Sequence, residues 1–457
     1  MYARLTRLVF AALLAALAPG GAVADEGSFE DAPAGESVKD LNSPLERAVR
    51  EEVRQETLFP FLTQALQHLP PFFADSEVTL RFRTYALPLE TAKGERAHAW
   101  TAGGKLGFRS GWLAETLQVG FGLYGSYPIV EDDPFAQTQL LRPGGQSYTV
   151  AGEAFLRLRW RQFEGTFYRQ ELDLPYVNKS DSRMTPNSFQ GAILQGSHKD
   201  TGWYKQVDWV GGWLSDIRPR FAEDFVSMGT GAGALDSNAG MLVAGVQIEP
   251  YEGASLGLYN YWVPDVLSIH YLATDVLRDL GGGWGFRTQW QYTLQTDGGG
   301  TDLLGKEFKT WVFGGRAALS QSGVTAWIGF SITSDEEDIR SPFGTYAGFG
   351  SMMQSDFNTA GEKAAIFGVS YDFKHLGVEG LSAFLQLGIG RGAKLPDQGL
   401  SGLDETEFDL TLDYKIPEGR LKGLWFRLRG ASALIDAPGQ DTARQVRFII
   451  NYDLPVL

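Results

Sequence analysis

Arginine residues recur at every second position of several apolar segments, where their guanidinium groups could bind carboxylates. In the run Leu424 to Arg429, Arg427 and Arg429 share one face of a strand, and the apolar residues between them share the other. Arg447 has the same place in the closing segment Val446 to Tyr452. Guanidinium groups form charge-assisted, often bidentate hydrogen bonds with carboxylates. A row of them could therefore pass an anion from one site to the next.

Strands of this kind require a setting that has hydrocarbon on one side and water on the other. The wall of a transmembrane antiparallel β-barrel is such a setting, and it would direct the arginines into the lumen. After residue 24, no run approaches the roughly 20 apolar residues that a spanning helix needs. If the protein sits in a membrane, we expect it to cross as strands.

The first 24 residues resemble a secretory signal peptide. Arg4 and Arg7 supply the charged start, Leu8 to Leu17 the apolar stretch, and Ala22-Val23-Ala24 a small-residue cleavage site. The mature chain would begin near Asp25. Export combined with membrane strands indicates the outer membrane of a Gram-negative bacterium.

Composition is consistent with a barrel and excludes several other classes. The chain has 56 glycines and 13% aromatic residues, which suit many turns and aromatic girdles, although a large β-sandwich could look similar. It has no cysteine, so disulfides, thiol nucleophiles and thiol-ligated metals are excluded. The formal charge of -15 becomes -17 without Arg4 and Arg7, which argues against nucleic-acid binding. Acidic residues gather in loops and arginines in strands, so we expect a locally positive lumen.

Residues 25–76 are expected to form a periplasmic extension that is partly helical, ahead of a barrel over residues 77–457. The segment 43–69 has helical spacing, with a break or kink at Pro60 and an end at Pro70-Pro71. Two interpretations remain open. The extension could dock on or partly plug the barrel mouth, or it could pack near the first strand.

We count eighteen strand-like windows, an even number as bacterial barrels require. They lie near residues 77–86, 99–110, 113–125, 148–162, 164–171, 190–196, 203–213, 240–248, 253–262, 266–276, 284–295, 308–320, 322–333, 361–373, 380–391, 406–416, 422–432 and 444–453.

The connections between these windows mostly alternate between long and short. Long connections are expected at 126–147, 172–189, 214–239, 334–360 and 392–405, and tight turns at 111–112, 163 and 321. Short turns face the periplasm in such barrels, so both termini are expected there. The segments 172–189 and 334–360 then become the third and seventh outer loops. The connection at 263–265 is short where a long loop is due.

Several blocks of the chain closely resemble the OprD-type outer-membrane porins. The resemblance runs in collinear order over roughly residues 77–457 and is most specific in the third loop. It is carried by Arg169 to Asn178, Asp181 to Gly191, Leu106 to Gly111, Phe225 to Met228, Tyr261 to Leu267, Ser355 to Asn358, Glu407 to Tyr414 and Asn451 to Pro455.

That family resemblance implies an eighteen-stranded barrel in which the third and seventh loops fold inward and lumen arginines guide small carboxylate-bearing solutes. It assigns Arg169 and the loop Leu172 to Phe189, with Tyr176 and Arg183, to the constriction, and Arg427, Arg429 and Arg447 to the ladder. Strand parity adds Arg81, Arg83, Arg109, Arg157 and Arg159.

Each arginine could instead form a structural pair with a wall acid such as Asp409 or Asp413. Tyr176 could stack on a ring-bearing substrate or only order the loop. Asp356 or Asp338 of the seventh loop could add selectivity by repelling simple anions or by engaging an ammonium group.

The expected partners are small organic acids or amino acids, outer-membrane lipid and lipopolysaccharide, and the barrel-assembly machinery. A monomer and a loose trimer both remain open, and no cofactor is expected.

The chain ends in Leu457, where many outer-membrane barrels end in an aromatic residue.

Two other classes of function remain open beside the channel. An outer-membrane hydrolase would need a serine, a histidine and an orienting group together, and His270 could lie beside a serine of a neighbouring strand. A closed structural or adhesion barrel would conduct nothing. No histidine pair has the i, i+4 spacing of a helical zinc site.

Overall fold

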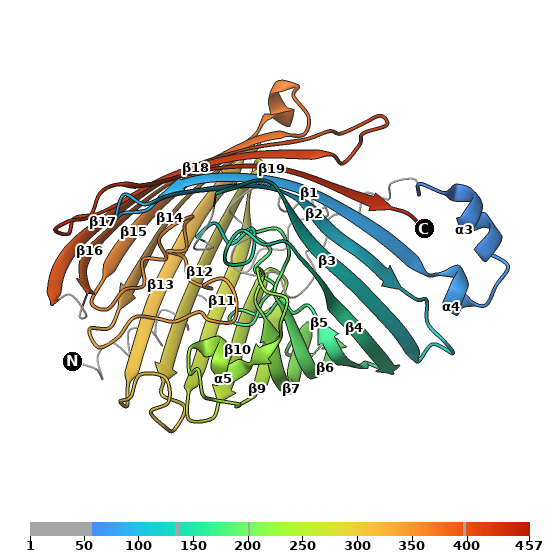
Figure 1. Cartoon of the computed structure of the whole chain (residues 1–457), viewed down its shortest axis with the longest axis horizontal. Coiled ribbons are helices and arrows are strands. Elements are labelled where there is room, and N and C mark those ends of the chain that lie inside the picture. Colours follow the sequence, from blue (N-terminus) through green and yellow to red (C-terminus); the bar gives the residue numbers. More distant parts are fainter. Residues whose placement is uncertain (1–56, 133–136, 200–201, 396–398) are drawn as a thin grey trace.

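The protein is a closed antiparallel β-barrel. The computed structural model describes residues 57–132, 137–199, 202–395 and 399–457. Nineteen strands form one sheet, and pairing of the first strand with the last closes the ring (Figure 1). Strands pair with their neighbours in sequence except at β8, which has two residues and pairs only with the end of β7, so that β9 also pairs with β7. Eighteen strands therefore make the wall, as the sequence predicts.

The strands are β1 (Glu77–Glu90), β2 (Arg96–Arg109), β3 (Leu117–Asp132), β4 (Tyr148–Trp160), β5 (Phe163–Gln170), β6 (Ser188–Lys199), β7 (Gln206–Arg218), β8 (Val226–Ser227), β9 (Met241–Tyr251), β10 (Ala254–Val263), β11 (Leu267–Gly281), β12 (Trp284–Thr296), β13 (Lys309–Gln321), β14 (Val324–Thr333), β15 (Lys363–Asp372), β16 (Leu381–Leu395), β17 (Leu400–Lys415), β18 (Trp425–Ile435) and β19 (Ala443–Pro455). The helical elements are α3 (Pro60–Leu66), α4 (Pro71–Ala74), α5 (Met228–Ala232) and the 3₁₀ turn η1 (Phe373–Leu376).

The wall strands are apolar on the outside and polar on the inside. On β17, Phe408 is 49% exposed and points outward, whereas the neighbouring Asp409 is 1% exposed and points into the barrel. Successive side chains of a strand face opposite sides, so this alternation places one face in lipid and the other in the lumen. Arg427 and Arg447 are buried on the inner face of β18 and β19, as their strand parity predicts.

Each predicted window overlaps one wall strand, but several boundaries were wrong. β3 begins at Leu117 and not at residue 113, because residues 113–116 form a turn closed by a bridge from Leu113 to Leu117. The long loop expected at 392–405 does not exist. β16 continues to Leu395 and β17 starts at Leu400, with register shifts near Ala393 that keep the two strands paired. Strands that project beyond the membrane lose their apolar alternation, so the pattern underestimates their length.

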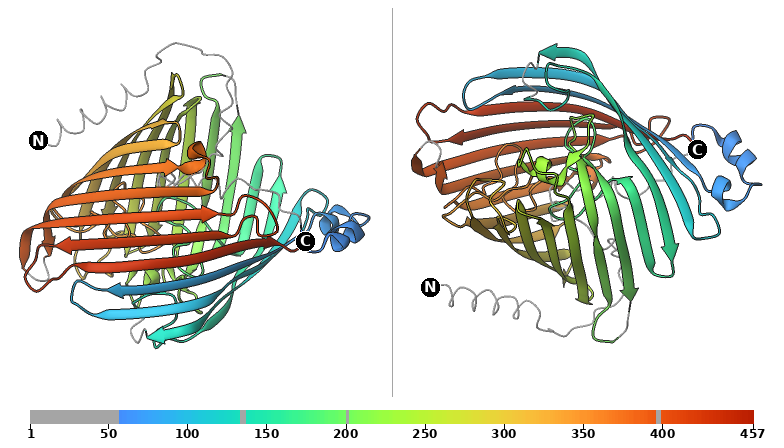
Figure 2. Two further views of the ribbon diagram at one scale, coloured as in Figure 1. Left: turned by 90° about the horizontal axis from the view of Figure 1, so that it is seen from above. Right: turned by 60° about the horizontal axis from the view of Figure 1, so that its bottom comes forward.

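The remaining long connections emerge at one end of the barrel. They include the third loop (171–187), the fourth loop (219–240) and the seventh loop (334–362), whereas the connection at 264–266 is short, as expected. β1 and β19 are antiparallel, with Thr79 beside Pro455, so the barrel's first strand starts and its last strand ends at the opposite end. Loop segments cross the inside of the ring of strands (Figure 2).

Two short helices precede the barrel. Pro60 is the first residue of α3, and Pro71, which was expected to end a helix, begins α4. Proline is well tolerated at a first helical position because its missing N–H has no partner there. Both helices lie beyond the edge of the barrel near the C-terminus, so this part of the extension does not plug the mouth (Figure 1). Residues 43–56 of the predicted helix lie outside the described residues.

None of the described helices is both long and apolar enough to span a membrane.

Candidate functional site: a basic constriction

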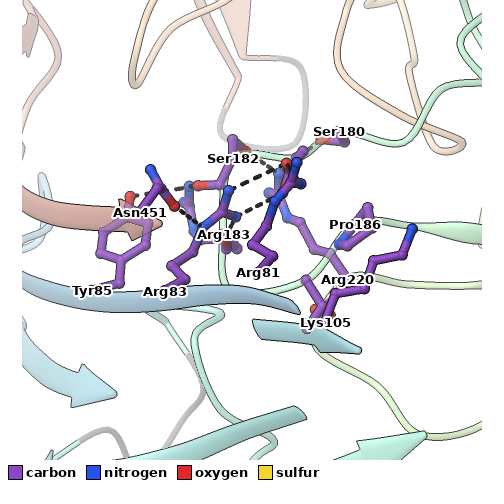
Figure 3. A network of polar contacts seen from close by, with 12 residues as sticks. Arg81, Arg83, Tyr85, Lys105, Ser180, Ser182, Arg183, Pro186, Arg220 and Asn451 are labelled. Atoms are coloured by element: carbon purple, nitrogen blue, oxygen red, sulfur yellow. Dashed lines mark hydrogen bonds and ion pairs between the residues drawn. The ribbon is translucent and has the colours of Figure 1, made fainter. Parts of the chain in front are cut away.

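The third loop is held against the barrel wall by two arginines of β1. The carboxylate of Asp181 accepts hydrogen bonds from Arg83 at 2.7 Å and from Arg81 at 3.2 Å. The Nε of Arg83 also donates to Asn451 of β19 at 2.6 Å (Figure 3). Burial opposes ionisation of Asp181, but the charges of Arg83 and Arg81 hold its pKa below the ordinary value. Arg81 also pairs with Asp453 at 2.6 Å, so the two arginines have two carboxylates and are largely neutralised.

The third and seventh loops are joined to each other around Asn178. Its backbone N–H donates to the carbonyl of Phe343 at 3.1 Å, and its side-chain amide exchanges two hydrogen bonds with the backbone of Thr345, at 3.1 and 2.9 Å. A Cβ on Gly344 would lie 2.5 Å from the Asn178 amide, so only glycine allows this approach. The two loops behave as one internal shelf.

Two further arginines, Arg183 and Arg220, come from the third and fourth loops. Arg183 donates to the carbonyl of Thr138 at 2.8 Å, and Arg220 donates to the hydroxyl of Ser182 at 2.6 Å. Burial lowers the pKa of Arg220 to about 10, and the charge of Arg447 adds to this effect. Burial likewise lowers the pKa of Arg183 to about 10, despite Tyr85 nearby and with a contribution from Arg220. Both side chains remain cationic at neutral pH.

Arg447 and Arg429 complete the group from the wall. They lie directly opposite each other on β19 and β18, although like charges in that relation destabilise a sheet. Arg447 donates to Gln445 at 3.0 Å and to the carbonyl of Met353 at 2.9 Å. The charge of Arg429 contributes to the lowered pKa of Arg183, which places the wall and loop arginines close together.

We call these residues the basic group: Arg81, Arg83, Arg183, Arg220, Arg429 and Arg447. Arg183, Arg220 and Arg447 form no ion pair with any carboxylate among the residues that the structure describes; their acceptors are hydroxyl, amide and carbonyl oxygens. The group therefore contains cationic side chains that are partly desolvated and that no carboxylate contacts directly.

The seventh loop rests on acidic residues of β17. Asp409 accepts from the backbone of Met353 at 3.0 Å, and Glu407 accepts from the backbone of Gln354 at 2.8 Å and of Ser355 at 2.6 Å. These wall acids hold the loop in place. Neither acid forms an ion pair with Arg447 within 4.0 Å, although the charges of both act on it.

Asp356 is an acid of the seventh loop whose charge acts on the basic group, and its carboxylate accepts from the hydroxyl of Ser351 at 2.7 Å. Its charge raises the pKa of Arg220 against the larger effect of burial. Asp338 accepts from the backbone of Ala360 at 2.7 Å and so belongs to a turn at the base of the loop.

The other expected ladder arginines have different surroundings. Arg427 is buried against Asp413 at 2.7 Å, which matches the structural-pair alternative. Arg109 pairs with Glu77 at 2.5 Å, Arg157 lies 3.3 Å from Glu164, and Arg159 stacks 4.1 Å from the ring centroid of Trp112. Arg169 donates to Gln190 at 3.3 Å and stacks on Phe225, and it makes none of these contacts with the basic group.

Tyr176 is 1% exposed and lies among other tyrosines. Its hydroxyl is 2.9 Å from that of Thr293, and its ring meets those of Tyr261, Tyr271 and Tyr346 at centroid distances of 5.7 to 6.4 Å. A side chain so enclosed supports the interpretation that Tyr176 orders the loop.

A cavity of about 350 Å³ adjoins the basic group on the side of the long loops. It is lined by Arg183, by Met353 to Ser355 of the seventh loop, and by Glu405 and Gln445 of the wall. A small organic molecule would fit into it. Arg183 is the member of the basic group that lines this cavity.

Strand parity could not have identified Arg220, because it lies in a loop. The pair of arginines flanking Pro219 is the only sequence signal near it. Lys105 was also missed; it lies between Glu171 at 2.9 Å and Glu153 at 2.6 Å, and is therefore neutralised. In the described part of the chain, no cluster of three or more histidine, cysteine or acidic side chains is placed to hold a metal ion.

Comparison with known proteins agrees with this architecture. Among solved structures, OccK9 (OpdG) of Pseudomonas aeruginosa is similar with a TM-score of 0.74 and 21% identity, covering 84% of this chain and 100% of that one. OpdK of the same organism, solved with vanillate, has a TM-score of 0.72 at 21% identity and the same coverage. OccAB1 of Acinetobacter baumannii has a TM-score of 0.75 at 16% identity, covering 86% and 99%. No curated protein matches the chain.

A family model described as an outer membrane porin of the OprD family matches residues 70–456. The match spans the whole barrel and begins just before α4. The closed eighteen-stranded wall and the two inward loops agree with it. The chain therefore belongs to the OprD family of outer-membrane porins.

Proposed function

We propose that this porin is a passive, substrate-selective channel for small solutes that carry a carboxylate. The observation that carries the proposal is the set of three constriction arginines, Arg183, Arg220 and Arg447, that have only neutral hydrogen-bond acceptors among the described residues. No chemical step is needed for this role.

Electrostatics favours an anion at this place. A partly buried guanidinium group without a counter-ion is destabilised by desolvation, and an entering carboxylate offsets that cost with charge-assisted hydrogen bonds. The neutral acceptors already form hydrogen bonds with part of each guanidinium group, so the binding free energy of a carboxylate stays moderate. A moderate gain suits conduction, which requires release as well as entry.

Asp356 supports a preference among carboxylates. An amino acid could place its carboxylate on the arginines and its ammonium group toward Asp356, whose charge reaches Arg220. The same acid would repel an inorganic anion, which has no ammonium group to offset the repulsion. We therefore expect small organic acids and amino acids to compete better than chloride.

The related structures give independent support. OpdK was solved with vanillate, which is a small aromatic carboxylate. We extend that solute class to this chain because its unpaired arginines could bind the same group. We also propose that the signal peptide at residues 1–24 is cleaved and that residues 25–76 lie in the periplasm. The proposed partners include lipopolysaccharide and the barrel-assembly machinery.

Single-channel recording in a planar bilayer tests the proposal. Aliphatic, aromatic and amino-acid carboxylates would be titrated against the purified mature protein, and block of the current would be measured. In Arg447→Gln we expect block to weaken by about tenfold or more, because a hydrogen bond to a charged group contributes about 1.5–3 kcal/mol.

Arg278→Gln is the matched control, because Arg278 stacks on Tyr251 at the end of β11 and contacts no member of the basic group. Its block should equal that of the parent. An open channel that ignores every carboxylate would reduce the protein to a general pore. Absence of channels in correctly folded protein would remove the transport function.

A further inference from the structure

Three polar side chains lie together on the outside of the barrel, on two neighbouring strands. The Nε2 of His270 on β11 is 3.4 Å from the hydroxyl of Ser268, two residues earlier. The Nδ1 of the same ring is 2.9 Å from the side-chain amide of Asn260, which is directly opposite on β10. β10 and β11 are adjacent in the wall (Figure 1).

The alternation of the two strands places this cluster on the lipid side. Tyr261 and Ile269 are fully buried in the inner core, so their neighbours Asn260, Ser268 and His270 lie on the outer face, where His270 is exposed and Ser268 is 7% exposed. Leu258 and Trp262 share this outer face and are exposed. Polar side chains facing lipid are unfavourable, and within membranes they often mark a functional site.

We propose that Ser268, His270 and Asn260 form a nucleophile, a general base and an orienting group for hydrolysis of carboxylic esters in membrane lipids. The spacing satisfies the geometric requirement of a nucleophile within reach of a base that a third group holds. The distance of 3.4 Å between Ser268 and His270 is typical of such a pair without substrate. Porin conduction does not require any of the three.

The reaction is balanced with water as the only co-reactant. In the structure the Asn260 amide nitrogen faces Nδ1 of His270 and donates to the Ile269 carbonyl at 3.5 Å. The reaction requires a half-turn of this amide, which places its oxygen against the Nδ1–H of His270 and leaves Nε2 free to take the Ser268 proton. The serine oxygen attacks the ester carbonyl carbon, and the bond to the alcohol breaks as His270 returns the proton to the alcohol oxygen. Water then gives His270 a proton and adds to the acyl carbon, and Ser268 regains its hydrogen as the fatty acid leaves.

The position of the cluster along the wall suits an ester. It lies within four residues of the short connection at 264–266, and Trp262 is directly opposite Ser268. Outward tryptophans form the girdle at the membrane interface, which is where lipid ester groups lie. A long loop between β10 and β11 would hinder access of lipid to the cluster, and here that loop is short.

The outer wall beside the cluster offers a site for an acyl chain. A groove of about 490 Å³ with little polar surface is bordered by His270 and Asn260 and continues along Leu258, Leu272 and Tyr292. It also reaches Tyr259 and Tyr271 of the inner face, and Ser268 lies beside it and does not line it. Thr296 on β12 is opposite Ser268 and on the same face. Opposed residues have Cβ atoms about 5 Å apart, so its hydroxyl could donate to the oxyanion of the tetrahedral intermediate.

A neutral orienting group is consistent with this setting. An aspartate facing lipid would carry a large desolvation cost, whereas an amide holds the imidazole without a charge. Any positive charge that His270 gains during the reaction would be transient.

The test uses the full mature protein in lipid nanodiscs and a fluorescent fluorophosphonate, which labels activated serines. We expect labelling of the parent and its loss in Ser268→Ala and His270→Ala. Ser432→Ala is the matched control, because Ser432 also faces outward on β18 but is opposite Phe408 and Arg444, with no histidine partner. Channel conductance reports that each variant is folded.

A second measurement identifies the ester. Release of fatty acid would be followed from phosphatidylethanolamine and from lipopolysaccharide in separate arms, with a diether lipid as the uncleavable control. We expect release to fall by about a hundredfold or more in Ser268→Ala, given the usual contributions of nucleophile and base. Labelling that persists in Ser268→Ala, or no release from either ester lipid by conducting protein, would overturn the proposal.

Discussion

Replacement of Asp181 by asparagine should release the third loop from the barrel wall and leave the charge of Arg83 without a carboxylate partner. The carboxylate makes a buried ion pair with Arg83 at 2.7 Å and a more exposed one with Arg81 at 3.2 Å. Removal of one partner of a buried pair destabilises by about 3–5 kcal/mol. The exposed pair adds at most about 1 kcal/mol, because water screens it. The asparagine oxygen can still accept one hydrogen bond, which reduces the total.

A net loss of about 3 kcal/mol changes the ratio of held to released loop by more than a hundredfold. Asn178 keeps the third loop attached to the seventh, so we expect fluctuation and not unfolding. Single-channel records of Asp181→Asn should show larger and noisier conductance. The reversal potential in a salt gradient should shift toward anion selectivity, since Arg83 loses its carboxylate partner while Arg81 keeps only Asp453.

Protonation of Asp181 should release the third loop in the same way as Asp181→Asn, but only at very low pH. The pKa of Asp181 is lowered on folding, so its stabilising contribution is present above the unfolded value of 3.8 and is lost as the pH falls through the folded value. Asp208→Asn is the control, because Asp208 accepts from Gln206 and has no arginine partner among the described residues. Records of Asp181→Asn that match those of the parent in both conductance and selectivity would refute the reasoning.

Three further changes address the shelf formed by the two loops. Burial and the neighbouring Glu405 raise the pKa of Glu362 to about 8. The contribution of Glu362 to stability is therefore complete below pH 4.5 and is lost as the pH rises through 8. Channel noise should increase from pH 7 to 9, and Glu362→Gln should remove that increase. Asn178→Ala should separate the loops and raise conductance, at a loss of about 1–3 kcal/mol for each buried partner left unsatisfied; unchanged conductance would argue against the clamp. Tyr176→Phe should lower the unfolding free energy by about 1 kcal/mol in denaturant titration, without altering carboxylate block, since its ring cannot reach the pore.

The wall could be predicted from the sequence because its signal is local. Each strand repeats with period two, and lipid outside and water inside give that repeat its contrast, so Arg427 and Arg447 were placed on the correct face. The pattern fails where strands leave the membrane. β16 and β17 project beyond it, and their paired ends were therefore taken for a loop.

The constriction could be predicted only in part, because it depends on contacts between distant segments. Asp181 reaches Arg83 across 98 residues, and Arg220 reaches Ser182 across 38. No periodicity connects such positions. The cluster of Ser268, His270 and Asn260 could be predicted in part. Ser268 and His270 are two residues apart in the sequence, but Asn260 comes beside them only through the pairing of β10 with β11.

Closure of the barrel between β1 and β19 has a consequence for assembly. Arg83 belongs to the first strand of the wall and Arg447 to the last, and the bond from Arg83 to Asn451 spans 368 residues. These arginines become neighbours only when the seam between the two ends of the wall is sealed. A barrel inserted with an open or misaligned seam could pass ions but would lack the complete anion site. Discrimination between solutes is thus acquired at the final step of folding, and it can serve as a readout of completed assembly.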